Sequence, residues 1–206
     1  ANIDFYPGQF FMVSFVDGEI KTSRAYSIAS SPLNKNYLEI GLDKVGPFTA
    51  KLFSMKEGDL LRFKGPYGKF YFNDEIKNNL LLIAGGTGIT PLMGIIRYCN
   101  DKKLSNKIKF IYSVRTPSDI IYKEELEKIK NENSNFDCVI TITRPNSENW
   151  KGIIGRIDRG LLKQNIEDAE ANLYYLCGPK EFVHSIIEML ESLGAKKEQI
   201  KTDIWG

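Results

Sequence analysis

The chain has 206 residues, of which 42% are hydrophobic and 26% charged, as is ordinary for a soluble globular protein of one or two domains. Its formal net charge of +2 argues against a nucleic-acid-binding protein, and no apolar run approaches the roughly 20 residues that span a bilayer. The three cysteines and single histidine lack the spacing of a metal site, so no metal is predicted, and without a signal pattern we expect a cytoplasmic protein.

The first part of the chain, from Pro7 to Phe72, reads as short strands broken by turns. Aromatic and β-branched residues gather in four ranges, which predict strands at Gln9–Val16, Arg24–Ile28, Tyr37–Leu42 and Leu60–Lys64. A short helix is predicted at Thr49–Met55. Several short strands with turn signals between them favour a small antiparallel barrel.

From about Asn79 onwards, predicted strands alternate with predicted helices. The strands are expected at Leu80–Ala84, Ile108–Val114, Phe136–Thr143 and Leu173–Cys177. The helices are expected at Thr90–Asn100, from the capping signal Thr116-Pro117-Ser118-Asp119 onwards, and at Pro179–Leu193. Such alternation predicts a parallel sheet with helices on its faces. The boundary is placed in 73–78, which divides the chain into domains 1–76 and 77–206.

A glycine-rich segment, Gly85-Gly86-Thr87-Gly88-Ile89-Thr90-Pro91, lies between a predicted buried strand and a predicted helix. Glycines let the backbone approach a ligand closely and adopt positive φ, and the start of a helix attracts a pyrophosphate. Thr90 is expected to cap that helix and Pro91 to be its first residue. A tight turn without a ligand is the alternative, but so many glycines and threonines exceed what a turn requires. The segment is neither a GxGxxG fingerprint nor a P-loop.

Two segments of the first part carry groups that suit a phosphate and an aromatic ring. On the strand that begins Arg24-Ala25-Tyr26-Ser27, alternate residues share a face, so Arg24 and Tyr26 combine a cation with a stacking platform. An exposed strand with no ligand is the alternative. In Gly46-Pro47-Phe48-Thr49, Thr49 is expected to cap the short helix, whose start is a second place for a phosphate, although capping alone explains the residue.

Cys177-Gly178-Pro179 stands at the end of a predicted strand, directly before the last helix. In doubly wound folds, ligands gather at the carboxyl ends of the strands, which places Cys177 at the edge of a nucleotide crevice. A cysteine buried for packing alone is the other interpretation.

Taken together and in this order, these motifs resemble those of the ferredoxin–NADP reductase superfamily over nearly the whole chain. The resemblance implies that Arg24 binds the flavin phosphate, Tyr26 stacks on the flavin ring, and Ser27 lies near flavin N5. Gly65-Pro66-Tyr67-Gly68 resembles the family's turn at the end of its barrel, and Arg115-Thr116 through Leu126 its next strand–helix unit. The family's first barrel strand normally precedes Pro7 and is mostly absent here, which leaves closure of the barrel open.

The resemblance also implies a set of site residues. Catalytic roles are expected for Ser27, Cys177 and Trp205, with Trp205 standing where plant-type relatives place a terminal tyrosine; packing on a surface is the alternative for that side chain. Cofactor contacts are expected for Arg24, Ala25, Tyr26, Ser27, Ile40, Gly46, Pro47, Phe48, Thr49, Gly86, Thr87, Gly88, Thr90, Arg115, Arg144, Cys177, Gly178 and Pro179.

The expected activity is hydride transfer from NADPH or NADH to a bound FAD, followed by electron transfer to an acceptor such as ferredoxin, flavodoxin or an oxygenase component. A Gly-x-x-Thr segment favours FAD over FMN, and Arg144 after Thr143 favours NADPH, whose extra phosphate needs a cation. Two alternatives stay open at this point. The chain is an electron-transfer subunit of a larger enzyme, or a redox-sensing module that binds nucleotide without turnover.

Overall fold

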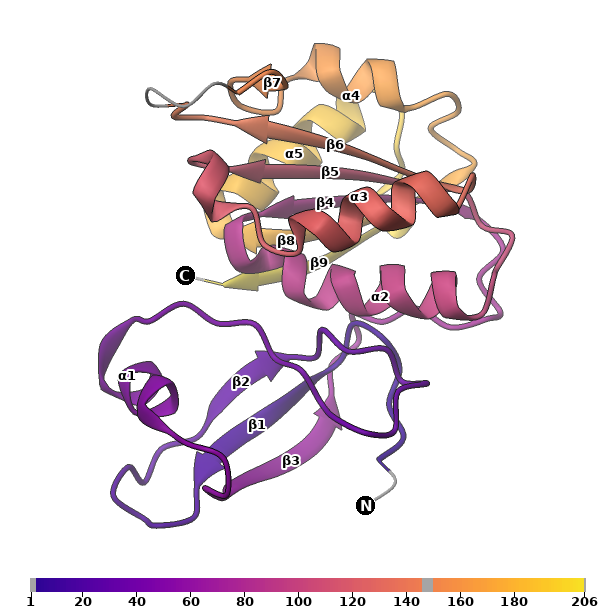
Figure 1. Ribbon diagram of the computed structural model, residues 1–206. Helices are drawn as coiled ribbons and strands as arrows, with labels where there is room; N and C mark the ends of the chain where they lie inside the picture. Colours follow the sequence, from indigo (N-terminus) through magenta and orange to yellow (C-terminus); the bar gives the residue numbers. More distant parts are fainter. Residues whose placement is uncertain (1–2, 146–149, 206) are drawn as a thin grey trace.

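The structure, a computed structural model, describes residues 3–145 and 150–205, which form two layered halves (Figure 1). The N-terminal half holds a three-stranded antiparallel sheet in the order β2-β1-β3. Its strands are β1 (Phe10–Phe15), β2 (Arg24–Ser27) and β3 (Leu61–Tyr67), and the helix α1 (Gly46–Ser54) lies at one end of them. Alternate residues of β1 are buried, as expected for a strand with one face on a core.

The small antiparallel sheet is confirmed, but the described residues do not close it into the predicted barrel. The range Tyr37–Leu42 adds no ladder strand: it contributes one bridge, between Ile28 and Ile40, and a hydrogen bond from the Ala29 N–H to the Glu39 carbonyl (2.8 Å). This segment runs towards the other half of the molecule, so its backbone leaves the sheet after a single pairing.

Helix α1 begins at Gly46, three residues before the predicted start. Thr49 is therefore not the N-cap, a position that Val45 takes. The Thr49 hydroxyl still contributes to the helix start, since it accepts a hydrogen bond from the N–H of the N-cap residue Val45 at 2.6 Å. Phe48 anchors the helix to the sheet, with its ring centroid 4.8 Å from that of Phe15.

The C-terminal half confirms the predicted parallel α/β architecture. Six strands, all paired in parallel, follow the order β7-β6-β5-β4-β8-β9. They are β4 (Asn79–Gly85), β5 (Ile108–Val114), β6 (Phe136–Ile142), β7 (Ile153–Ile154), β8 (Asn172–Pro179) and β9 (Ile200–Trp205). Because the chain carries a helix between most successive strands, the carboxyl ends of all six meet at one edge.

Four helices cover this sheet, two on each face (Figure 1). Helices α2 (Ile89–Asp101) and α3 (Lys123–Glu132) pack on the face that carries Leu80 and Leu82, and α4 (Arg159–Asn165) and α5 (Lys180–Ser192) on the face of Leu81 and Ile83. This two-sided burial explains the continuous apolar run of β4. Within the residues described, no helix is long and apolar enough to cross a bilayer.

Two helix starts differ from the prediction, and each of these helices follows a short 3-10 turn. Gly86–Gly88 forms such a turn, so α2 starts at Ile89 and Thr90 lies inside its first turn, where its hydroxyl donates to the Thr87 carbonyl (2.9 Å). The Thr116–Asp119 capping box forms, but it caps only the turn Pro117–Asp119. Helix α3 starts later, after Tyr122.

Candidate functional site

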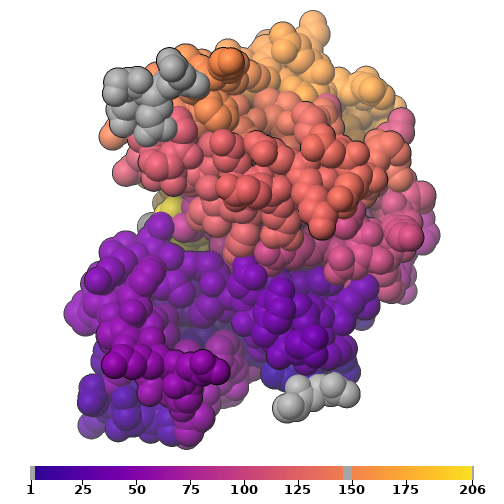
Figure 2. Space-filling view, in the orientation of Figure 1, coloured from indigo at the N-terminus to yellow at the C-terminus, as the bar shows by residue number. Residues whose placement is uncertain are grey.

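A cleft of about 1070 Å³ lies between the two halves, at the carboxyl ends of the parallel strands. Figure 2 shows it as a hollow between the indigo N-terminal half and the magenta-to-orange half, with the yellow last strand at its base. Its size suits a bound dinucleotide or cofactor. The N-terminal half contributes Ile40, Gly41, Leu42, Asp43, Val45, Leu52 and Phe53, and the other half Gly85, Gly86, Thr87, Ser113, Val114, Arg115, Ser118, Asp119, Ile121, Thr143, Pro179, Phe182 and Trp205.

The glycine-rich loop forms the centre of this cleft, between β4 and α2. Gly86 has φ +57°, a left-handed conformation that side chains rarely adopt, and a Cβ there would meet nothing within 4 Å. Gly88 is buried against β8: a Cβ on it would lie 2.2 Å from the Cys177 carbonyl oxygen. The N–H of Ile89, the first residue of α2, donates to the Gly86 and Thr87 carbonyls, so it is the positive end of the helix dipole that favours an anionic group at the loop.

Ser27, Cys177 and Asp203 converge from three strands at the junction of the two halves. The Ser27 hydroxyl donates to the Asp203 carboxylate (3.3 Å), and the Cys177 thiol donates to the same oxygen (3.8 Å). Ser27 ends β2 of the antiparallel sheet, whereas Cys177 and Asp203 pair across β8 and β9. One carboxylate therefore holds a side chain from each half of the molecule.

Burial sets the protonation of this cluster. It raises the pKa of the Cys177 thiol well above its ordinary value of 9.0, and the nearby Asp203 carboxylate raises it further. Cys177 is therefore a protonated donor at neutral pH, not a thiolate nucleophile. Burial also raises the pKa of the Asp203 carboxyl above 3.8, although the hydrogen bonds from Ser27 and Cys177 oppose this shift.

Trp205 closes the base of the cleft. It lies at the end of β9, pairs with Pro179 of β8, and keeps 42% of its surface exposed. Because side chains alternate along a strand, Trp205 and Asp203 share one face of β9. An exposed aromatic plane thus stands beside the Ser27–Cys177–Asp203 cluster.

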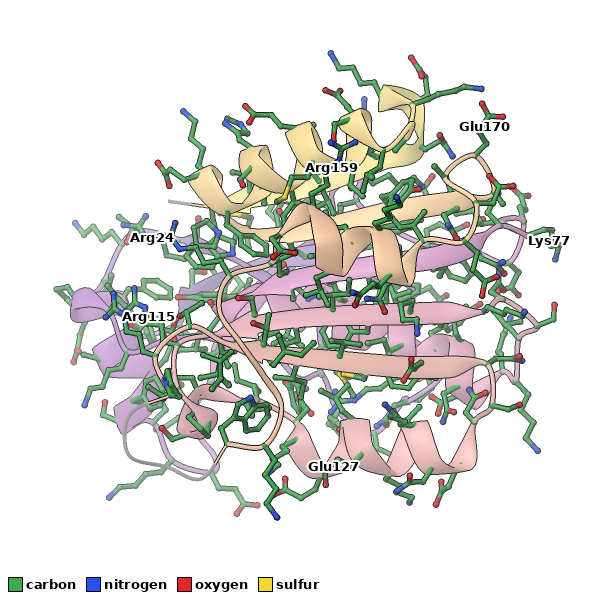
Figure 3. All side chains as sticks on the ribbon, turned by 90° about the horizontal axis from the view of Figure 1, so that it is seen from above. Arg24, Lys77, Arg115, Glu127, Arg159 and Glu170 are labelled. Atoms are coloured by element: carbon green, nitrogen blue, oxygen red, sulfur yellow. The ribbon has the colours of Figure 1, made fainter. Side chains whose placement is uncertain are left out.

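The predicted flavin-side residues lie around β2 and α1. Tyr26 is half-buried and stacks on Phe48, with ring centroids 6.1 Å apart. Arg24 is exposed, two residues before Tyr26 on the same strand, and its only described hydrogen bond goes to the neighbouring Ser23 carbonyl. Figure 3 shows Arg24 and Arg115 at the same end of the molecule, where the parallel strands end.

The structure separates the predicted site residues into three groups. Six line the cleft: Ile40, Gly86, Thr87, Arg115, Pro179 and Trp205. Six are buried outside the lining: Phe48, Thr49, Gly88, Thr90, Cys177 and Gly178. The others lie outside the lining and are not buried: Arg24, Ala25, Tyr26, Ser27, Gly46, Pro47 and Arg144.

Sequence analysis missed two carboxylates of this site. Asp203 stands two residues before Trp205, and strand alternation from that tryptophan was the one signal that would have found it. Asp43 lines the cleft and accepts a hydrogen bond from Thr87 Oγ1 (3.3 Å), so it joins the two walls of the cleft next to the glycine loop. No local pattern distinguishes Asp43 from an ordinary loop residue.

Comparison with known families divides the chain as the two sheets do. An oxidoreductase FAD-binding domain model matches residues 1–72, and an oxidoreductase NAD-binding domain model matches residues 82–188. The second match alone covers more than half of the chain.

Individual proteins resemble most of the chain. A component of the Na⁺-translocating NADH-quinone reductase of a Marinomonas species is 32% identical over 200 residues, covering 89% of this chain and 48% of that protein. The gamma subunit of sulfhydrogenase 1 of Pyrococcus furiosus is 32% identical, covering 95% and 66%. The chain thus spans about half the length of the curated relatives it matches first. The FAD/NAD-binding domain of a Vibrio cholerae nitric oxide dioxygenase has the same fold, with a TM-score of 0.85, 21% identity, and coverage of 99% and 86%.

Proposed function

The chain belongs to the ferredoxin–NADP reductase superfamily of FAD- and NAD-binding oxidoreductases, and from this premise we propose that it is the electron-input module of a multi-component enzyme. Membership establishes an NAD(P)H-dependent flavin oxidoreductase that uses FAD. Bound FAD would supply the redox chemistry, as the acceptor of a hydride from NAD(P)H and the source of electrons for an acceptor. The identity of that acceptor is part of the proposal.

One observation carries this function: the cluster of Ser27, Cys177 and Asp203 joins the two halves beside the glycine loop. The family's flavin half supplies Ser27, and the family's nucleotide half supplies the other two. We propose that the cluster aligns the nicotinamide with the flavin. Positioning of two reactants in this way lowers a barrier by several kcal/mol. The buried Cys177 thiol and the half-buried Ser27 hydroxyl act as neutral donors to Asp203, and Trp205 is proposed to shield the flavin face from water.

We propose that the flavin lies against β2 and the start of α1. The exposed cation of Arg24 suits its phosphate, and the half-buried ring of Tyr26, backed by Phe48, suits its ring. At the start of α1, Gly46 has φ +77° and open space around its Cβ position, which leaves room for a pyrophosphate. Ala25, Ile40, Pro47 and Thr49 are proposed to frame the same site.

The nucleotide is proposed to lie over Gly86–Gly88, with Thr87 and Thr90 at its phosphates and Cys177 to Pro179 beside its nicotinamide. Arg115 lines the cleft beyond the glycine loop and is the cation best placed for the adenosine end. Arg144 lies outside the lining, so its proposed contact with an NADPH phosphate requires the bound nucleotide to extend past the cleft. The choice between NADH and NADPH is decided by the titration below.

The partner and the location complete the proposal. Both named relatives are parts of larger enzymes, which supports a partner protein as the electron acceptor, whether ferredoxin-like, flavodoxin-like or an oxygenase component. All three cysteines are unpaired, which supports a reducing compartment such as the cytoplasm. We also propose the domain division 1–76 and 77–206, with β1, β2 and β3 as part of a flavin-binding barrel.

An anaerobic titration of the FAD-loaded protein with NADH, and separately with NADPH, tests the activity. We expect the flavin absorbance to bleach with at least one of them, and the faster of the two to be the donor. If FAD is bound and neither nucleotide bleaches it, the reductase function is wrong, and the redox-sensing alternative takes its place.

Replacing Arg24 tests the flavin site. Arg24→Gln is expected to weaken FAD binding by about tenfold or more, because a charge-assisted contact with phosphate is lost. Arg62→Gln is the control, since Arg62 is also exposed but lies on β3, away from the proposed phosphate position. FAD affinity is measured by fluorescence titration of the apoprotein, and equal losses in both variants would contradict the assignment.

A further inference from the structure

One face of helix α2 lies directly on the N-terminal half. Thr90, Gly94 and Arg97 are spaced at i, i+4 and i+7, so they share a face of the helix. A Cβ on Gly94 would lie 2.7 Å from the Ile28 carbonyl oxygen, and a Cβ on Gly41 would lie 2.3 Å from Thr90 Oγ1. The helix that begins at the glycine loop is therefore packed against the flavin half at backbone distance.

Arg97 is the last of these three residues, and its side chain forms hydrogen bonds and ion pairs with residues of both halves. Its Nε and Nη2 donate to the two oxygens of Glu125, at 2.7 Å each. Its Nη1 donates to the Ala29 carbonyl (2.8 Å) and lies 3.2 Å from a Glu39 oxygen. The Arg97 side chain is only 13% exposed, so this cation depends on its partners in place of water.

Tyr122 completes the network from the nucleotide half. Its hydroxyl donates to the Glu39 carboxylate, and its ring lies under Arg97, 4.7 Å from the guanidinium carbon. Tyr122 has φ +59°, a strained conformation for a bulky residue. Such strain persists only where surrounding contacts fix it, and it is commonest where a side chain must be held in place for function.

Two of the residues that contact Arg97 lie next to site residues in the sequence. Ala29 follows Ser27 by two residues, and Glu39 precedes Ile40 and Gly41, which line the cleft. Arg97 itself lies on the helix that carries the glycine loop. A buried ion pair adds little net stability compared with apolar packing, and its best-attested role is to fix the arrangement of the parts that it joins.

We propose that Arg97, through its contacts with Glu39, Glu125 and Tyr122, is a positioning residue that sets the flavin half against the nucleotide loop for hydride transfer. This inference rests on the proposed function. In this proposal the network contacts neither the substrate nor the cofactor. A shift of about 1 Å in the relative position of two reacting groups lowers a rate by about a hundredfold, which is the scale of effect expected here.

Three variants weaken the network in graded steps. Arg97→Lys keeps the charge but loses the bidentate contact, Glu39→Gln removes one carboxylate, and Tyr122→Phe removes only the hydroxyl that bonds Glu39. Each FAD-loaded variant is mixed anaerobically with NADH or NADPH, whichever reduces the wild type faster. The limiting rate of flavin reduction is measured at saturating nucleotide, and the affinities for nucleotide and for FAD are measured separately. We expect the limiting rate to fall by about tenfold to a hundredfold, with FAD affinity unchanged.

The control is Asp137→Asn, which breaks an ion-pair cluster with Lys109 and Lys130 inside the nucleotide half. It is expected to leave the limiting rate unchanged. Tyr122→Phe and Glu39→Gln should be non-additive when combined, because they share one hydrogen bond. Wild-type rates in Arg97→Lys and Tyr122→Phe would overturn the proposal, as would an equal slowing in Asp137→Asn. Failure of the wild type itself to be reduced would instead contradict the proposed function.

Discussion

Gly88→Ala is expected to abolish rapid flavin reduction by NAD(P)H. The new methyl group would lie 2.2 Å from the Cys177 carbonyl oxygen and 2.6 Å from the carbonyl carbon, both backbone atoms of strand β8. Either the glycine loop or the end of β8 must move, and each carries part of the proposed nucleotide site. Displacement by about 1 Å predicts a loss of about a hundredfold in rate, and overpacking predicts a loss of about 1–3 kcal/mol in stability.

The measurement is stopped-flow reduction of the bound FAD, with the denaturant midpoint recorded in parallel. Gly160→Ala is the matched control: Gly160 lies in α4, its φ is not in the positive region, and the nearest atom to a new Cβ is a side-chain oxygen of Asp158 at 3.2 Å, not a backbone atom. Gly160→Ala is expected to reduce FAD at the wild-type rate. Normal reduction in Gly88→Ala would show that the close approach of the loop to β8 is not needed for the reaction.

Asp203→Asn is expected to slow flavin reduction by about tenfold to a hundredfold while FAD stays bound. The amide keeps the size of the carboxylate, but its oxygen carries no charge and accepts the hydrogen bonds from Ser27 and Cys177 more weakly. The contact between the two halves is therefore weakened. Ser27→Ala should be non-additive with it, since both remove the same contact. Asp101→Asn, at the exposed end of α2, is the control. Equal rates in Asp203→Asn and wild type would remove Asp203 from the site.

Asp203→Asn is also expected to change how the free energy of unfolding depends on pH. Because burial raises the pKa of Asp203 above its unfolded value, the folded chain holds that proton more tightly than the unfolded chain. Protonated Asp203 therefore stabilises the folded chain at acid pH. This stabilisation is lost as the pH rises from the pKa of the unfolded state through the higher pKa of the folded state. Asp203→Asn has no such titration. We expect a urea midpoint that declines less than that of wild type over this window; a steeper decline would contradict the shift.

Local patterns in the sequence were sufficient to predict the parts of the fold that depend on local burial. The apolar run of β4 and the glycines after it predict a buried parallel strand and a close ligand loop, and both are present. The parallel sheet follows because alternating strands and helices have few ways to pack. The starts of α1 and α2 were predicted late, because the hydroxyls of Thr49 and Thr90 bond back to carbonyls three or four residues earlier, and a threonine used in this way looks like an N-cap in the sequence.

The missed residues depend on contacts between distant parts of the chain. Ser27 and Asp203 are 176 positions apart, and Arg97 reaches Ala29 over 68 positions. An isolated aspartate on a strand or an arginine on a helix carries no sign of such a partner. The last strand β9 itself was overlooked because its apolar residues are few and mostly exposed. Its position at the sheet edge follows from pairing with β8, which only the tertiary structure provides.

The most direct test of hydride transfer at this cleft is a single-turnover reaction of the FAD-loaded protein with the preferred nicotinamide nucleotide, unlabelled or deuterated at C4. We expect the flavin to bleach as one oxidised nucleotide forms per FAD, more slowly with deuterium on the transferred side, and more slowly again in Asp203→Asn. If FAD is bound but stays oxidised while the nucleotide remains reduced, the account of this protein as an NAD(P)H-dependent flavin oxidoreductase is contradicted.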